Sequence, residues 1–175
     1  MKNNCINFFK IIANIEIPFN SNPIKYEFDK KNKIINVDRI MPSTMFYPAN
    51  YGFIDNTLAL DGDTLDILVI TPYPLHIMCR IECRPIGMLR TSDEKGEDCK
   101  IISVPTNNIT NEYDCIKDIT DISSYLKNQI SFFFEHYKKL ENNKWVKIIG
   151  WENCESSIKE IEICKNRYKN KKKIY

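Results

Sequence analysis

Short apolar runs separated by polar turns occupy the first two thirds of the chain, and this pattern predicts β-strands. Residues 11–17 are apolar and rich in β-branched side chains, and the run ends at Pro18. Polar and aromatic residues alternate over residues 25–28, and a polar turn separates them from a second apolar run at residues 34–37. Two such runs joined by a polar segment predict a β-hairpin with a longer loop.

Three later apolar runs predict further strands, at residues 66–70, 79–89 and 100–104. The run at residues 66–70 is short and continuous, which is typical of a buried strand. Residues 41–52 instead carry two prolines, an asparagine and a glycine, and they predict a structured loop. The first two thirds of the chain are therefore expected to form a sheet of short strands.

Two helices are predicted in the last third of the chain. Apolar residues recur at spacings of three and four over residues 122–137, as on one face of a helix, with Thr120 or Asp121 as the candidate N-cap. A second helix is predicted to begin near Asn153, and basic residues near its end suit the helix dipole. Residues 144–151 between the helices predict a short strand. Strands followed by helices favour an α+β domain built on a small, strongly curved sheet or barrel.

Composition narrows the class of protein. At 175 residues the chain fits one domain, residues 1–175, with peripheral tails at 1–10 and 169–175. The net charge of +2 is too balanced to indicate a nucleic-acid or membrane partner. No apolar run reaches the ~18 residues of a membrane span, and we find no small-residue cleavage site of a signal peptide. The basic residues 169–173 are interpreted as a solvated helix end.

Cysteine and histidine usage argues against a zinc site. The seven cysteines include no CxxC pair and there are only two histidines, so the usual ligand spacing of zinc sites is missing. We interpret the cysteines as reduced, small hydrophobic residues of a cytoplasmic protein.

The most distinctive segment is the acidic run Asp61-Gly62-Asp63-Thr64-Leu65-Asp66. If it is extended, residues two apart face the same side, so Asp61 and Asp63 converge and Asp66 lies at the mouth of the following strand. Carboxylates this close repel one another, and hard cations such as Mg²⁺, Mn²⁺ or Ca²⁺ relieve that repulsion. A solvated acidic turn has the same local pattern, so both interpretations stay open on this segment alone.

A second acidic segment, residues 93–98, is by itself typical of a solvated turn, but beside the first it is interpreted as the other half of a multi-metal site. Cationic and phenolic side chains could bind a small polyanion, because Arg offers phosphate a planar fork, Lys a point charge and Tyr a neutral donor. They are Lys25, Arg39, Tyr47, Tyr51, Lys100, Tyr137 and Lys138. The carboxylates would bind metal cations, and the neighbouring cationic side chains would bind an anion. Together they indicate an anionic substrate that binds with its metal, and pyrophosphate with Mg²⁺ is such a substrate.

Several segments, in order along the chain, closely resemble the family I (soluble) inorganic pyrophosphatases of bacterial type. The matching segments are Glu16-Ile17-Pro18, Pro23-Ile24-Lys25-Tyr26-Glu27, Val37-Asp38-Arg39, Phe46-Tyr47-Pro48-Ala49-Asn50-Tyr51-Gly52, residues 60–69, Thr71-Pro72-Tyr73-Pro74, Gly96-Glu97-Asp98-Cys99-Lys100, Phe133-Phe134-Glu135-His136-Tyr137-Lys138, Lys144-Trp145-Val146-Lys147 and Gly150-Trp151. They run from near residue 14 to the last helix, and chance does not produce so many matches in one order. Thr64 departs from the Pro or Glu that the family usually has there, and Thr does not preset the backbone as Pro does.

The resemblance implies a five-stranded, OB-like β-barrel flanked by two helices in the C-terminal half, assembled as a homo-hexamer. It implies hydrolysis of pyrophosphate to two orthophosphates by metal-activated water, with several Mg²⁺ ions in each site and Mn²⁺ as an alternative. Asp63 matches the position that orients and deprotonates the attacking water. The matching metal ligands are Asp61, Asp66, Asp93, Asp98 and Glu27. The matching phosphate contacts are Lys25, Arg39, Tyr51, Lys100, Tyr137 and Lys138, supported by Glu16 and Tyr47.

Two other functions fit parts of the sequence. An oligonucleotide-binding module would stack bases on aromatic residues of a curved sheet and meet phosphates with the basic tail. The acidic segments 61–66 and 93–98 would repel such a backbone, so we expect no nucleic-acid partner. A catalytically inactive, metal-binding homologue is the other alternative, although all the carboxylates and phosphate donors of the family pattern are present.

Overall fold

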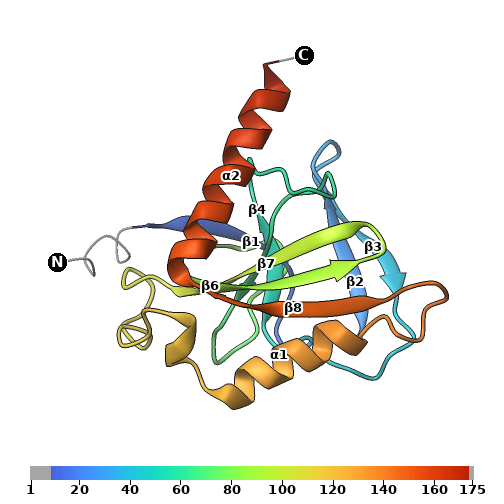
Figure 1. Ribbon diagram of the computed structural model, residues 1–175, viewed down its shortest axis with the longest axis horizontal. Helices are drawn as coiled ribbons and strands as arrows, with labels where there is room; N and C mark the ends of the chain where they lie inside the picture. Colours follow the sequence, from blue (N-terminus) through green and yellow to red (C-terminus); the bar gives the residue numbers. More distant parts are fainter. Residues whose placement is uncertain (1–8, 174–175) are drawn as a thin grey trace.

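A closed ring of strands forms the centre of the fold, and Figure 1 shows how these strands are arranged. The structure is a computed structural model that describes residues 9–173, so most of the predicted tail at residues 1–10 and the last two residues lie outside it. The strands of the ring pair in the order β1 (Ile11–Ile17), β4 (Asn50–Ile54), β5 (Asp66–Val69), β7 (Gly96–Pro105) and β6 (Arg80–Asp93). β1 also pairs with β6 and closes the ring. The predicted α+β fold with a five-stranded barrel is confirmed.

Three more strands lie outside this ring. β8 (Val146–Asn153) pairs with the second half of β6, on the edge opposite β7 and beyond the residues that pair with β1, and it corresponds to the strand predicted at residues 144–151. β2 (Ile24–Asp29) and β3 (Ile34–Ile40) form a separate two-stranded ribbon, which confirms the predicted hairpin. Only the pair of β5 and β7 is parallel among these pairings, and that pair carries the centre of the candidate site.

The strand β4 was predicted as part of a loop, and this prediction was wrong. The glycine and the asparagine that suggested a loop, Gly52 and Asn50, instead allow β4 to pack closely against neighbouring segments. A Cβ at Gly52 would lie 1.8 Å from the carbonyl oxygen of Asn14, so only glycine fits where β4 crosses the bulge of β1. The Asn50 side chain is fully buried and accepts a hydrogen bond from the Phe19 backbone N–H at 2.9 Å.

Helices α1 (Ser124–His136) and α2 (Cys154–Lys172) follow in the last third. The N-cap of α1 is Ser123, whose hydroxyl accepts from the Leu126 N–H at 3.2 Å. The predicted caps, Thr120 and Asp121, belong instead to a 3₁₀ turn, Ile119–Asp121, and Ile122 is extended between the turn and α1. The predicted N-cap of α2, Asn153, is confirmed, because its side chain accepts from the Ser156 N–H at 2.9 Å.

The two helices cover opposite faces of the central sheet. Leu68 of β5 packs in one core cluster with Phe133 and Phe134 of α1. Its neighbour Ile67 packs in the other cluster with Ile161 of α2. Both faces of β5 are therefore buried, which explains its continuous apolar run. Within residues 9–173, no helix is long and apolar enough to cross a membrane.

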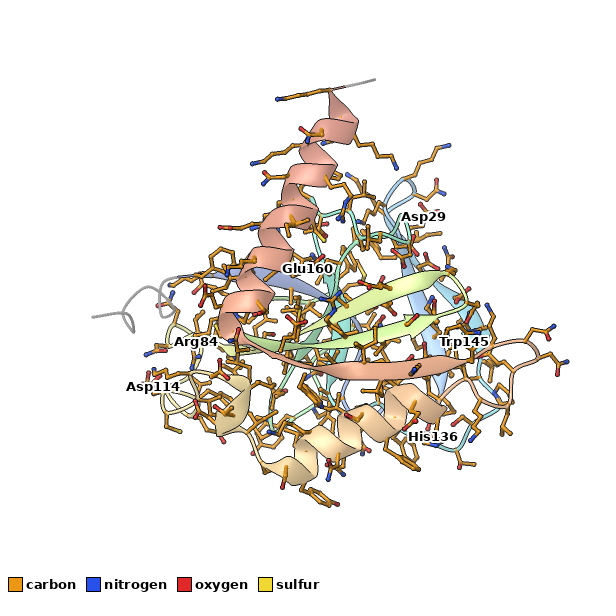
Figure 2. All side chains as sticks on the ribbon, viewed as in Figure 1. Asp29, Arg84, Asp114, His136, Trp145 and Glu160 are labelled. Carbon is orange, nitrogen blue, oxygen red and sulfur yellow. The ribbon has the colours of Figure 1, made fainter. Side chains whose placement is uncertain are left out.

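A buried arginine anchors the long connection between β7 and α1. Arg84 of β6 is 3% exposed, and its guanidinium donates to the Tyr113 carbonyl at 2.6 Å. Burial lowers the pKa of Arg84, and the negative charge of Asp114 opposes that change. Figure 2 shows both side chains on the same side of the fold. This contact lies away from the candidate site, so its role is structural.

Candidate active site

The acidic segment 61–66 ends at the first residue of β5, as predicted, but its first half is a turn. Gly62 has φ +93°, and the Asp63 N–H donates to the Asp61 carboxylate at 3.1 Å. The segment is therefore not extended as predicted, because the backbone turns at the glycine between Asp61 and Asp63. Burial raises the pKa of Asp61, the backbone hydrogen bond opposes the rise, and the charges of Asp63 and Asp98 add to it.

Asp66 is the centre of the site. It is the first residue of β5 and pairs with Lys100 on the parallel strand β7, so their side chains lie together. The Lys100 ammonium donates to Asp66 Oδ2 at 2.7 Å and to Asp98 Oδ2 at 2.9 Å. Asp98 stands two residues before Lys100, on the same face of the strand. The Tyr51 hydroxyl, from β4, donates to the same oxygen of Asp66.

The charged groups of Asp66, Asp98 and Lys100 are largely shielded from water. The Lys100 side chain is 3% exposed, whereas those of Asp66 and Asp98 are each 25% exposed. Burial raises the pKa of Asp66, and the Lys100 ammonium opposes the rise. Burial lowers the pKa of Lys100, but the two carboxylates outweigh it and hold the value well above its usual range. Two carboxylates share one ammonium, so the cluster has a net negative charge that favours a further cation.

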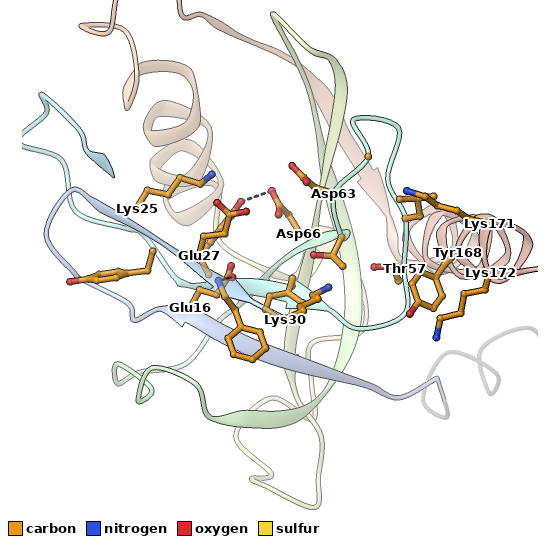
Figure 3. Close-up of a pocket in the computed structure, with 17 residues that line it drawn as sticks. Glu16, Lys25, Glu27, Lys30, Thr57, Asp63, Asp66, Tyr168, Lys171 and Lys172 are labelled. Carbon is orange, nitrogen blue, oxygen red and sulfur yellow. Dashed lines mark hydrogen bonds between the residues drawn. The ribbon is translucent and has the colours of Figure 1, made fainter. Parts of the chain in front are cut away.

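A pocket of about 620 Å³ opens beside this cluster. Figure 3 shows Asp63, Asp66 and Glu27 around the same space. The predicted site residues that line the pocket are Glu16, Lys25, Glu27, Tyr51, Asp63 and Asp66. These come from β1, β2, β4, β5 and the acidic turn, so the ring of strands brings together side chains that are far apart in the sequence.

Glu16 is a second carboxyl group of the pocket whose pKa is raised by burial. Its side chain accepts a hydrogen bond from the Phe28 N–H at 2.8 Å. Burial raises its pKa to about 7, the hydrogen bond opposes that rise, and the nearby charges of Asp66 and Glu27 add to it. Near neutral pH, Glu16 therefore keeps a proton for part of the time, unlike an ordinary glutamate.

The second acidic segment divides between two clusters. Asp98 joins Asp66 through Lys100, as described above. Asp93, at the β6–β7 turn, accepts instead from the Lys138 ammonium at 2.8 Å. Glu94 in the same turn accepts from Lys144 at 2.6 Å. Burial opposes the effect of these lysines, but their hydrogen bonds and charges lower the pKa of Glu94 to about 2. The sequence analysis placed Glu94 in the acidic segment 93–98 and Lys144 in a segment that matches the family, but it gave neither residue a role.

The β2–β3 ribbon supplies a third charged group. Lys25 and Arg39 pair across the ribbon and lie 3.2 Å and 3.5 Å from the Asp38 carboxylate. The Arg39 Nε atom lies 3.4 Å from Glu141. Both cations are half-buried beside carboxylates that neutralise part of their charge.

Two tyrosines connect the ribbon with the central cluster. The Tyr47 ring lies 5.8 Å from the Tyr51 ring, and the Tyr137 ring packs 5.2 Å from Phe133. Burial raises the pKa of Tyr137 to about 12, and the charges of Lys100 and Arg39 lower it in part. Burial likewise raises the pKa of Tyr47. Both hydroxyls therefore stay protonated and can act as neutral donors.

The last turns of α2 also line the pocket, which the sequence analysis did not predict. Tyr168, Lys171 and Lys172 line it from α2, and Lys30 lines it from the end of the β2–β3 ribbon on the other side (Figure 3). The spacing of Tyr168, Lys171 and Lys172 places them on one helix face. That spacing was visible in the sequence, but nothing in the sequence showed what this face meets.

The donor set suits a hard divalent cation. All the side-chain anions around Asp66 are carboxylates, and oxygen ligands favour Mg²⁺, Mn²⁺ or Ca²⁺. Within residues 9–173, however, no three Asp, Glu, His or Cys side chains are arranged to hold a metal ion. The Lys100 ammonium lies between Asp66 and Asp98 and neutralises part of the charge that a metal would meet. The residues therefore fit such an ion by chemistry, and the ion would compete with Lys100 for these carboxylates.

Comparison with known proteins adds an independent result. Residues 13–169 match the family model described as inorganic pyrophosphatase. The chain is 55% identical to the inorganic pyrophosphatase of Escherichia coli K12 over 157 residues, which are 90% of this chain and 89% of the relative. An inorganic pyrophosphatase from Coxiella burnetii superposes with TM-score 0.89 at 46% identity, covering 91% of this chain and 95% of that one. The structure of the Helicobacter pylori enzyme gives TM-score 0.89 at 41% identity, covering 91% and 94%.

Proposed function

The chain belongs to the inorganic pyrophosphatase family, and on this premise we propose that it hydrolyses inorganic pyrophosphate to two orthophosphates with Mg²⁺ as its metal. The observation that carries the proposal is the arrangement around Asp66. Carboxylates that suit a divalent cation lie beside ammonium and phenol groups that suit phosphate, at the edge of one pocket. Both halves of a metal–pyrophosphate substrate therefore find partners of the right charge.

Asp61, Asp66 and Asp98 would hold the metal that binds most tightly, and Glu27 and Asp93 would serve ions that accompany the substrate. When bound, Mg²⁺ supplies Lewis acidity and neutralises charge on the phosphoryl oxygens. Mn²⁺ has the same ligand preference and would be its natural substitute.

The side chains of this chain bind the substrate and move one proton. Donors to phosphate oxygens would be Lys25, Arg39, Tyr51, Lys100, Tyr137 and Lys138, with Glu16 and Tyr47 supporting them. An exposed carboxylate, Asp63, reaches the pocket and would accept a proton from the attacking water. The water oxygen forms a bond to one phosphorus, and the bridging oxygen leaves with the electron pair of its broken P–O bond.

The role of Asp63 is tested by Asp63→Asn. Because the amide cannot accept the proton, we expect turnover at saturating Mg²⁺ to fall by about 10²–10⁴-fold while KM changes little. Glu97→Gln is a matched control, because Glu97 is an exposed carboxylate that pairs with Arg90 outside the pocket. Turnover of Asp63→Asn close to that of the control would refute the assigned role.

We also propose that the protein assembles as a homo-hexamer in the cytoplasm. Large apolar side chains are exposed on α1 and the loops next to it, among them Phe46, Tyr125, Phe132 and Leu140. Such a patch supports association with other copies of the chain. The mass of the particle in solution, measured by light scattering, tests this assembly, and a monomer at micromolar concentration would contradict it.

A further inference from the structure

The pocket carries both signs of charge, and Lys25 lies among the carboxylates at its inner end. Its inner end holds the carboxylates of Glu16, Asp63 and Asp66. Its outer end is bounded by Lys30 on one side and by Lys171 and Lys172 of α2 on the other (Figure 3). An anionic substrate approaching the inner carboxylates is repelled by them until its metal and its donors are in place, so cations at the entrance would compensate that repulsion.

The three lysines at the outer end are free to meet an anion. Within residues 9–173, none of them forms an ion pair. The Lys30 ammonium instead lies 4.6 Å from the centre of the Phe53 ring, and that of Lys172 lies 4.8 Å from the centre of the Tyr168 ring. A ring face positions an ammonium without neutralising it, so these charges keep their attraction for a ligand.

The predicted phosphate donors differ from these lysines. Lys25, Lys100 and Lys138 each lie within 3.2 Å of a carboxylate oxygen, and the buried ones cannot meet a substrate that is still in solvent. Lys171 and Lys172 are exposed on the last turns of α2. They are therefore placed to act before the substrate reaches the inner donors.

We propose that Lys30, Lys171 and Lys172 form an outer cationic rim that captures the anionic metal–pyrophosphate substrate and guides it to Asp66. This inference rests on the proposed pyrophosphatase function. The rim acts on the encounter and not on the chemical step, so it contributes to kcat/KM and leaves kcat unchanged. Because the rim is solvent-exposed, its effect decreases as salt screens the charges.

The test compares two double variants of the same helix. Lys171→Gln with Lys172→Gln removes two charges that line this pocket. Lys165→Gln with Lys169→Gln removes the same charge from α2, but these two residues line only a second pocket next to β1, which Lys172 also borders. Both double variants remove two positive charges from α2, so their effects on net charge are matched.

Steady-state hydrolysis of magnesium pyrophosphate is measured at ionic strengths of about 0.01 M and about 1 M, where the Debye length falls from roughly 30 Å to 3 Å. At low ionic strength we expect kcat/KM of the Lys171/Lys172 variant to fall by about 3- to 10-fold, a part of the range that electrostatic steering covers. We expect kcat to stay within about twofold of the wild type, and the difference in kcat/KM to vanish at high salt. Arginine at both positions keeps the charge and should keep the wild-type kcat/KM.

Two results would overturn the rim. One is a kcat/KM of the Lys171/Lys172 variant equal to that of the wild type or of the Lys165/Lys169 control at low salt. The other is a loss that persists unchanged at high salt, because it would indicate a structural defect of α2. Failure of the proposed function itself is recognised separately, because the wild-type protein would then release no phosphate from pyrophosphate under either condition.

Discussion

Replacing Lys100 with methionine should destabilise the metal-free protein, and the size of the loss follows from the contacts of its ammonium. That group lies 2.7 Å from Asp66 and 2.9 Å from Asp98, and its side chain is almost fully buried. Removing one partner of a buried ion pair costs about 3–5 kcal/mol, because the remaining charges stay uncompensated. Asp66 and Asp98 keep some contact with water, so we expect about 3 kcal/mol, the lower end of that range.

The loss should depend on pH and on metal. Without Lys100, the pKa of Asp66 rises further above that of the unfolded chain. The folded variant then binds protons more tightly than the folded wild type, and the stability deficit grows once the pH exceeds the raised pKa that Asp66 already has in the wild type. We expect a small deficit at acidic pH and the full deficit at alkaline pH. A divalent cation that binds the native carboxylates should restore much of the stability.

The assay is urea denaturation of wild type, Lys100→Met, Asp66→Asn and the double variant, in a chelator and in Mg²⁺. Because the double variant removes one of the two opposed carboxylates, it should be more stable at alkaline pH than Lys100→Met alone. A coupling free energy of about 1 kcal/mol or more is expected between the two positions. A Lys100→Met protein within about 1 kcal/mol of wild type in the chelator, or a deficit that does not change with pH, would refute the reasoning.

Three further predictions concern stability, each measured by urea denaturation in a chelator. Glu16→Gln should raise the free energy of unfolding above pH 7 by up to about 3 kcal/mol, because the raised pKa of Glu16 shows that its ionised form is costly in the folded protein. This gain in stability should be absent near pH 4 and should grow as the pH rises to 7. Gly52→Ala should cost more than about 3 kcal/mol, because its Cβ would collide with the Asn14 carbonyl, whereas Gly150→Ala, with no atom within 4 Å of the new Cβ, should stay within about 1 kcal/mol. Ser123→Ala should cost about 1 kcal/mol as the loss of an N-cap, and no change would contradict the assigned cap.

Local patterns predicted most of the elements, and they failed where tertiary contacts decide. The cap at Asn153 and the strand beginning at Asp66 follow from residue types and spacing alone. β4 was missed because its glycine serves a close crossing with β1, which is visible only once the two strands are paired. The turn at residues 61–63 was missed because alternation was given more weight than the glycine between the two aspartates.

In the candidate site, too, the sequence identified individual residues but not the contacts between them. The family pattern named Asp66 and Lys100 as site residues, but their direct ion pair depends on the parallel register of β5 and β7 across 34 residues of sequence. The rim lysines of α2 lie more than a hundred residues from Asp66 in the sequence, and their local pattern is that of an ordinary solvated helix end. Only the three-dimensional fold shows that this helix end borders the pocket.

The central claim is tested most directly by phosphate release from pyrophosphate, with and without Mg²⁺, beside ATP and a simple phosphomonoester at the same concentrations. We expect rapid release from pyrophosphate that requires Mg²⁺, and little release from the other two substrates. No release from pyrophosphate, with Mg²⁺ still bound to the protein, would contradict it and would favour an inactive metal-binding homologue.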